Sequence, residues 1–487
     1  ILANVLVENR LLDRAVDVYR RGRVASGDSA MFAVELGQLM IATMDYSGAT
    51  GELLTWLARN PSQLAYVQNR LATFTGKPDG RAAAIEAVRA ALRDKEDARR
   101  YELLSWLYLE GKDFEQALEA ARGVDRLGNR QGTALLDFGD RAYRAGAFDV
   151  AVRAFNEAAS TPLPATRIPA AKYGIACALK EEGLQSDSVR GPFVRMGEPG
   201  EGSMPALDRA ISAFREVIDN YPRTEFSAKS WYQIGVLQAE RFFNLDGGLQ
   251  SLERAAQELA GVTIVRQQIH LKIGQIRVIQ GDTARAAEEF RSVAATASAL
   301  PDQLDEANFR LAELDFFAGR FEAASARLAS IALNVKNDFA NDAIELQSFL
   351  AENQTTPQPV LRDYARSALF ARQRRNSEAI ALYQKVARSA PQAPLADDAL
   401  FAAATLQANA GRFTEAVTGY EQLLSEFKDR GALLDRAQFR IGEVYQFGLR
   451  DAPHAIAAYE KLLAEYPSSV LGDEARKRIR QLRGEVL

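Results

Sequence analysis

The amino-acid sequence predicts an all-α protein, a solenoid built from about twelve helix–turn–helix repeats. Alanines recur at a fixed spacing of 34 residues, and bulky, proline and glycine residues recur at constant offsets from them. Hydrophobic residues make up 47% of the chain, which supplies enough apolar surface for a core that continues from repeat to repeat. The alanines that mark the strict spacing are Ala15, Ala49, Ala83, Ala117 and Ala151.

Each repeat places three further residue types at fixed distances from its alanine. A bulky side chain follows four positions later, so it shares the helix face of the alanine. Proline follows twelve positions after the alanine and ends the second helix, and glycine often precedes the alanine by twelve positions. The bulky residues are Tyr19, Leu53, Phe155, Phe214, Phe290, Tyr383, Tyr420 and Tyr459; the prolines are Pro61, Pro222, Pro391 and Pro467; the glycines are Gly37, Gly139, Gly274 and, one position out of register, Gly442.

The period and these offsets together resemble the tetratricopeptide repeat over nearly the whole chain. The resemblance implies a right-handed superhelix in which the first helices of successive repeats line a concave groove. In this family such grooves bind extended peptides or helices of partner proteins. The implied function is therefore a protein–protein interaction scaffold.

Changes in the spacing divide the chain into segments. The stretch 183–204 is rich in glycine and proline and disfavours helix, so we expect a loop insertion there, with a hinge or a separate lobe. Pro357 and Pro359 are expected to exclude a regular helix from the residues around them. The expected segments are an N-terminal array at 1–182 with the strict period, the loop insertion at 183–206, an array at 207–337 with a 38-residue period, an extra helix and proline-containing linker at 338–360, repeats at 361–469 and a capping helix at 470–487.

The repeats of the C-terminal half share a more specific sequence pattern. Tyr466 and Pro467 are followed by small polar residues and then Ala475, and Tyr221 and Pro222 are followed by Ala228 in the same way. Over residues 207–487 this sequence pattern resembles repeats of bacterial envelope proteins. Examples are the Tol-Pal-associated cell-division coordinator, the outer-membrane assembly lipoprotein and export lipoproteins for exopolysaccharides. The resemblance implies a periplasmic or envelope-associated protein, and a cytoplasmic location is the alternative.

Charge and hydropathy argue against two classes of function. A net charge of −4, with 25% charged residues, predicts no nucleic-acid binding. The sequence contains no run of eighteen apolar residues, so a membrane-spanning helix is not expected. We expect membrane association only indirectly, or through an anchor lost ahead of Ile1.

No residue pattern indicates a catalytic centre, a cofactor or a metal site. His270 and His454 lack neighbours at metal-ligand spacing, so we expect His270 to be packed and His454 to be solvated. The lone Cys177 lies in a helical pattern and is expected to be buried. The acidic pairs at 397–398 and 288–289 are adjacent in sequence and are expected on solvated helix faces. We therefore expect a protein that is not an enzyme.

A row of aromatic residues is the candidate for partner binding. Each follows the early bulky position of a first helix and is expected to face the groove, where aromatic side chains often anchor interfaces. The alternative is that each ring packs half-buried against the next repeat. Among the neighbouring charges Arg436 is outnumbered by Glu306, Glu313 and Glu443, so a clamp for C-terminal carboxylates is not expected. The candidates are Trp106, Tyr143, Tyr232, Phe309, Tyr364, Phe401 and Phe439, with Leu271 in the same row.

Three functions remain open at this point. The first is a non-enzymatic scaffold of a bacterial envelope assembly that binds peptide segments or helices of other proteins. The second is a carbohydrate-handling module of an exopolysaccharide export system, in which the aromatic row would stack on sugars. The third is a cytoplasmic adaptor or regulator.

Overall fold

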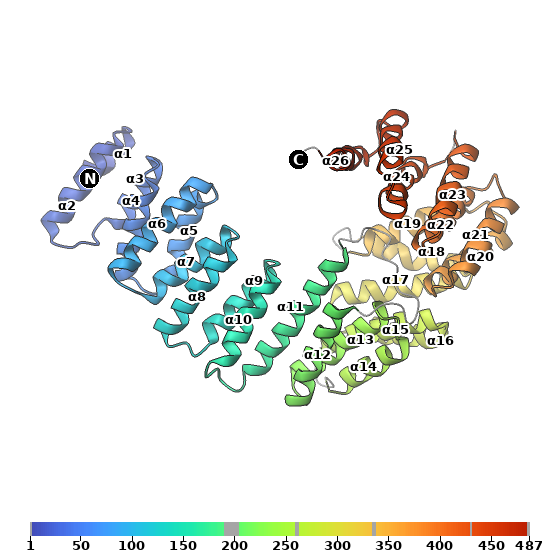
Figure 1. Cartoon of the computed structure of the whole chain (residues 1–487), viewed down its shortest axis with the longest axis horizontal. Coiled ribbons are helices and arrows are strands. Elements are labelled where there is room, and N and C mark those ends of the chain that lie inside the picture. The colour runs from blue at the N-terminus through green and yellow to red at the C-terminus, as the bar shows by residue number, and fades with distance from the viewer. Residues whose placement is uncertain (1, 189–203, 259–262, 334–337, 429–430, 485–487) are drawn as a thin grey trace. The chain divides into compact units, whose positions relative to one another are not determined.

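The computed structural model describes residues 2–188, 204–258, 263–333, 338–428 and 431–484. Within these ranges every regular element is helical, and within each unit most successive helices pack on each other (Figure 1). The prediction of an all-α solenoid of paired helices is confirmed. Two compact units divide the chain: residues 1–182 together with 209–217, and residues 183–208 together with 218–487.

The first unit consists of consecutive helix pairs and one long helix. Packing alternates between the two helices of a pair and the contact to the next pair, as between α7, α8 and α9. Residues 209–217 of α12 complete the unit. The helices are α1 (Leu2–Glu8), α2 (Leu12–Ser26), α3 (Ala33–Ala42), α4 (Tyr46–Arg59), α5 (Leu64–Thr75), α6 (Pro78–Asp94), α7 (Ala98–Glu110), α8 (Phe114–Gly128), α9 (Thr133–Arg144), α10 (Phe148–Ser160), α11 (Ile168–Ser188) and α12 (Pro205–Asn220).

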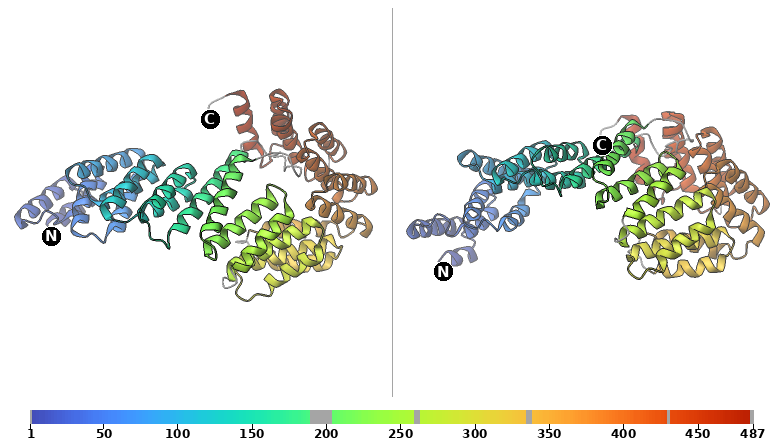
Figure 2. Two further views of the ribbon diagram at one scale, coloured as in Figure 1. Left: turned by 60° about the horizontal axis from the view of Figure 1, so that its bottom comes forward. Right: turned by 90° about the horizontal axis from the view of Figure 1, so that it is seen from below.

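The second unit continues the same pairing and contains one helix outside it. In Figure 2 this unit runs from green through yellow to red, and successive helices such as α13 and α14 or α21 and α22 pack on each other. The helices are α13 (Glu225–Glu240), α14 (Leu245–Glu258), α15 (Thr263–Gln280), α16 (Thr283–Ala294), α17 (Pro301–Phe317), α18 (Phe321–Ala332), α19 (Ala340–Glu352), α20 (Gln358–Arg372), α21 (Asn376–Ser389), α22 (Leu395–Asn409), α23 (Phe413–Glu426), α24 (Leu434–Glu443), the π-helical turn η1 (Val444–Leu449), α25 (Ala452–Glu465) and α26 (Gly472–Arg483).

Glycine and the bulky residue of each pair fit together in the core. A Cβ atom on Gly139 would lie 2.6 Å from the ring of Phe155, so only glycine lets α9 approach α10 this closely. Gly274 makes the same room for Phe290. Except for the half-buried Tyr19, the bulky residues of the repeat are buried, which explains why they recur at one offset.

In one repeat the buried alanine is not the one that the 34-residue spacing predicts. Ala83 is only half-buried, whereas its neighbour Ala84 is fully buried, with Val88 fully buried one turn further on. Helix α6 begins at Pro78, after a turn of only two residues, and its buried face runs through Gly80, Ala84 and Val88. The prediction that Ala83 marks the core in this repeat is therefore wrong by one residue.

Two expected boundaries also move. Helix α11 continues to Ser188, six residues past the expected end of the first array, and α12 begins at Pro205. Residues 189–203 of the expected loop insertion lie outside the described residues. Helix α20 begins at Gln358, because Pro357 is its N-cap and Pro359 lies in its first turn, where proline needs no hydrogen-bond acceptor.

The out-of-register glycine has a local cause. The π-helical turn η1 follows α24 directly and adds one residue to the connection. Gly442 therefore makes room for Tyr459 seventeen positions later, whereas Gly139 makes room for Phe155 sixteen positions later.

Charged side chains connect neighbouring repeats. Arg122 donates two hydrogen bonds to Glu157, at 2.8 and 2.6 Å, and Lys272 pairs with Glu240 at 2.7 Å. Each pair spans close to one repeat length in sequence. No helix in the described parts of the chain is both long and apolar enough to cross a membrane.

Candidate interaction groove

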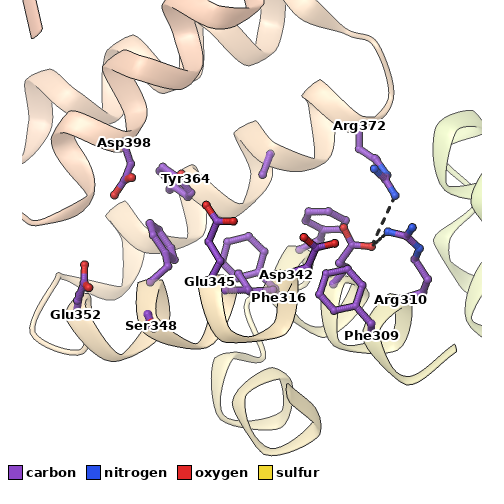
Figure 3. Close-up of a pocket in the computed structure, with 15 residues that line it drawn as sticks. Phe309, Arg310, Phe316, Asp342, Glu345, Ser348, Glu352, Tyr364, Arg372 and Asp398 are labelled. Atoms are coloured by element: carbon purple, nitrogen blue, oxygen red, sulfur yellow. Dashed lines mark hydrogen bonds and ion pairs between the residues drawn. The ribbon is translucent and has the colours of Figure 1, made fainter. Parts of the chain in front are cut away.

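A cavity lies in the second unit, between α17, α19, α20 and α22 (Figure 3). Its volume is about 650 Å³. Helix α19 stands outside the pairing, because it packs on α18 while α17 contacts α20 directly. The groove thus exists where an additional helix enters the repeat array.

Aromatic side chains form the floor of the groove. The rings of Phe349 and Tyr364 stack with centroids 4.6 Å apart, and Phe316 meets Phe349 edge-on at 6.1 Å. Tyr364 in turn contacts the buried ring of Tyr383 at 5.2 Å. Offset and edge-on ring pairs of this kind hold each other in place. The floor is therefore an apolar surface of fixed shape.

Carboxylates form one wall. Asp342, Glu345 and Glu352 are exposed on one face of α19, and Asp398 of α22 lies across from them (Figure 3). Among the described residues none of the four has an ion-pair partner within 4 Å. This wall is a negative surface that the chain itself leaves unneutralised.

Asp398 has a raised pKa. Burial is the main cause of the rise to about 7; the nearby carboxylates of Asp397, Glu352 and Glu345 contribute to it, and Arg436 opposes it. A side chain that titrates near neutral pH lies beside a wall of fixed negative charge.

Hydrogen bonds with residues outside α22 hold its first turn in place. Asn353 is fully buried, and its Oδ1 accepts a 3.0 Å hydrogen bond from the backbone N–H of Leu395. Asp397 is also buried and accepts hydrogen bonds from the N–H groups of Asp398 and Ala432, at 3.0 and 3.2 Å. These contacts fix the position of Asp398 at the groove.

The expectation that the acidic pairs lie on solvated faces is therefore wrong for residues 397–398. It also fails for Glu289, whose carboxylate lies 2.7 Å from Nδ1 of His270 and 3.9 Å from Nε of Arg277. Adjacent residues on a helix point in different directions, but both can still be buried where neighbouring helices pack on two sides.

Guanidinium groups stand at the other end of the groove. Arg310 lies 2.6 Å from Glu313, and Arg372 lies 3.8 Å from the same carboxylate (Figure 3). One carboxylate is thus shared by two arginines. Arg310 also lies 3.8 Å from Glu306, so Arg310 is paired on both sides, and the longer contact of Arg372 is its one ion pair among the described residues.

Two of the aromatic residues expected to bind partners line the groove, Phe309 and Tyr364. Tyr364 is half-buried, whereas Phe309 is 6% exposed and packs against the ring of Phe339 at 5.6 Å. Phe439 is 7% exposed and lies beneath the guanidinium of Arg478. The remaining candidates lie outside this groove. Of these, Leu271 is buried, and the half-buried ones are Trp106, Tyr143, Tyr232 and Phe401.

The sequence alone did not single out the acidic wall. The spacing of Asp342, Glu345 and Glu352 on a helix was a usable signal for a shared face. That these carboxylates have no partner depends on which helices surround them. Glu443, expected beside the groove, is instead 4% exposed and pairs with Arg440 and Arg478 at 2.6 and 2.9 Å.

His270, His454 and Cys177 do not line the groove. In the part of the chain that the structure describes, no cluster of three or more His, Cys, Asp or Glu side chains could hold a metal ion. Cys177 is buried, and His454 is exposed beside Asp451, with Nδ1 2.7 Å from its carboxylate.

Paired helices in a linear array, with a groove formed by several repeats, define a helical-repeat protein. Two tetratricopeptide-repeat family profiles match the chain, one over residues 364–432 and the other over 436–469. These segments, which include most of α20 and all of α22, match the tetratricopeptide repeat, and the described chain is an all-α array of paired helices. Repeats of this family typically form non-enzymatic scaffolds that bind proteins.

Solved structures of low similarity include other tetratricopeptide-repeat proteins. The P58(IPK) TPR domain is 13% identical, with 89% of this chain and 98% of that one covered and a TM-score of 0.22. Yeast Tom70 is 14% identical, with 87% and 96% covered and a TM-score of 0.24. A human IFIT1 dimer with m7Gppp-AAAA is 15% identical, with 80% and 81% covered and a TM-score of 0.28. Similarities of this size give no information about the partner of this chain.

No curated protein matches the chain in sequence.

Proposed function

We propose that this chain is a non-enzymatic scaffold that holds a segment of a partner protein in the groove between α17, α19, α20 and α22. The observation that carries this proposal is the combination of a fixed aromatic floor with a wall of unpaired carboxylates. A cavity of about 650 Å³ is within the usual range of ligand-binding clefts.

A purely structural role explains the wall poorly. Elsewhere several charges are neutralised between repeats, as Arg122 is by Glu157 at 2.6 Å. Carboxylates gathered without a partner repel one another and contribute nothing to stability. Grouped charges of one sign do favour a partner of the opposite sign and exclude others. The wall is better explained by binding than by folding.

A protein segment fits the groove better than a sugar does. Sugar stacking needs accessible ring faces, but Phe309 is 6% exposed and the face of Phe349 is covered by Tyr364. Apolar side chains of a peptide need only the edges and gaps that the floor leaves open.

Crosslinking in cells tests this function. A photo-reactive amino acid at Ser348, which is exposed and lines the groove, should capture one dominant partner protein. The same probe at Glu322, exposed on α18 and not part of the groove lining, is the matched control. Equal adduct patterns from the two sites would overturn the proposal.

We also propose a periplasmic or envelope-associated location. It is supported only by the sequence pattern of the repeats over residues 207–487, for example Tyr466 and Pro467 followed by Ala475. Fractionation of the native host separates the alternatives, because a periplasmic protein is released with the periplasmic contents or sediments with the envelope. Recovery with the cytoplasm would overturn this location and leave the scaffold function unaffected.

A further inference from the structure

A second cavity adjoins the groove. It has a volume of about 380 Å³ and shares the side chains of Arg310 and Arg372 with the groove. Residues of α13, α14, α15 and α20 and the turn after α20 complete its lining, among them Arg374 and apolar side chains such as Ile276 and Ile279. Both cavities therefore reach the same pair of arginines.

The charge of this second cavity is positive. Arg374 donates a hydrogen bond to the backbone carbonyl of Glu240 at 3.4 Å, and its guanidinium lies 4.2 Å from the ring centre of Phe243. Among the described residues Arg374 has no carboxylate within ion-pair distance. Lys272, by contrast, is neutralised by Glu240 at 2.7 Å. Arg372 and Arg374 supply the excess positive charge.

The two ends of the combined cavity thus carry opposite charges that lack full neutralisation. Glu345, Glu352 and Asp398 lie at one end, and Arg372 and Arg374 lie at the other. The stacked aromatic floor lies on the acidic side of the arginines. The arrangement selects a ligand by the order of its charges as well as by their number.

We propose that the occupant is an extended peptide segment of a partner protein with basic side chains at one end, acidic side chains at the other and apolar side chains between them. This inference rests on the proposed scaffold function. The basic end lies against Glu345, Glu352 and Asp398, and the acidic end lies against Arg372 and Arg374. Apolar side chains between them contact the floor formed by Phe316, Phe349 and Tyr364.

Charge order gives this interaction its selectivity. A segment that is basic throughout meets Arg372 and Arg374, and one that is acidic throughout meets the wall of α19. Each such encounter places like charges together, which suppresses binding. The selectivity must weaken with salt, because exposed charges are screened over about 8 Å at physiological ionic strength.

Synthetic peptides on the full chain test the inference by fluorescence anisotropy. The probes are three labelled peptides of equal length with the same apolar centre: lysines at one end and glutamates at the other, lysines at both ends, and glutamates at both ends. We expect the mixed peptide to bind about tenfold more tightly than either of the others at physiological salt. A lysine-only peptide that binds as tightly as the mixed one would overturn the inference.

Charge-reversal variants locate the two ends. Glu345→Lys with Glu352→Lys should weaken binding of the mixed peptide about tenfold and favour the glutamate-only peptide. Arg372→Glu, at a side chain that is 41% exposed, should weaken the mixed peptide and favour the lysine-only one. The control pair Glu288→Lys with Glu322→Lys makes the same net change at exposed sites elsewhere and should leave all three affinities unchanged. A control effect equal to that of the groove variants would overturn the inference.

Failure of this inference is distinguishable from failure of the scaffold function. If Ser348 captures a partner and the Glu345→Lys, Glu352→Lys variant captures it equally well, the charge assignment is wrong and the scaffold function stands. If Ser348 and the control site capture the same proteins and no peptide binds, both are wrong.

Discussion

Helices α7 to α10 and helices α17 to α22 use the same repeat with different results. In the first region charges are paired between repeats: Arg122 with Glu157, Arg126 with Glu96 and Arg153 with Glu115. In the second region α19 enters outside the pairing and leaves its carboxylates without partners. The regular region thus has ion pairs that connect successive repeats, whereas the carboxylates of α19 and Asp398 face one groove without such pairs.

The cavities of the two regions differ in the same way. A cavity of about 440 Å³ lies beside α7 and α8, but its arginines, among them Arg122 and Arg126, already have carboxylate partners. The groove beside α19 is larger, and four of its carboxylates have no ion-pair partner among the described residues. Volume alone does not distinguish a packing defect from a binding site, but unpaired charge does.

The largest expected effect tests how tightly the regular region is packed. Phe155 is 1% exposed and fits against Gly139 and Gly174, so Phe155→Ala should lower the free energy of unfolding by about 3 to 5 kcal/mol. Tyr364→Ala, at a half-buried ring of the groove floor, should cost about half as much. Hydrogen exchange of the surrounding helices measures each loss locally. Equal losses would remove the packing difference between the two regions.

The next effect compares a buried, paired carboxylate with an exposed one. Glu443→Ala leaves Arg440 and the largely buried Arg478 without this partner, and should cost about 3 kcal/mol. Glu460→Ala removes an exposed pair with Arg483 and should cost less than about 1 kcal/mol. Denaturant unfolding followed by circular dichroism, with hydrogen exchange of α24 to α26, checks both. A small effect at Glu443 would mean that its burial is not maintained in solution.

A smaller effect concerns the pH dependence of the groove. Burial raises the pKa of Asp398 to about 7, above the value of about 4 for an unfolded chain, so the folded chain binds this proton more tightly. The free energy of unfolding should therefore fall as the pH rises from about 4 to about 7. Asp398→Asn should add about 1 to 2 kcal/mol at pH 8 and nothing at pH 4, because the groove is partly solvated. Parallel pH curves for the two proteins would contradict this.

The smallest effect on stability belongs to the wall itself. Glu345→Gln with Glu352→Gln removes charges that have no partner, so the free energy of unfolding should change by less than about 0.5 kcal/mol. Thermal unfolding of the double variant measures this. A loss above that limit would show that the wall supports the fold, and the comparison between the two regions would then lose its basis.

Much of the fold could be predicted from the sequence because repeat packing is local. Only glycine at position 139 leaves room for the ring of Phe155, and this requirement recurs at each repeat and is visible as a constant offset. Proline two residues after α4 and α12 likewise ends each helix through its own backbone chemistry. Such features depend on residues within one helix pair.

The groove could not be predicted in the same way, because it is formed by contacts between helices that belong to different pairs. Ala84 replaces Ala83 in the core because of how α6 enters its repeat, and Asp398 is half-buried because neighbouring helices pack around the start of α22. The sequence by itself determined the helix pairs and their spacing, and it predicted Phe309 and Tyr364 as candidates for partner binding. Only the tertiary structure decided which charges lack partners, because ion pairing depends on which side chains of other helices come within reach.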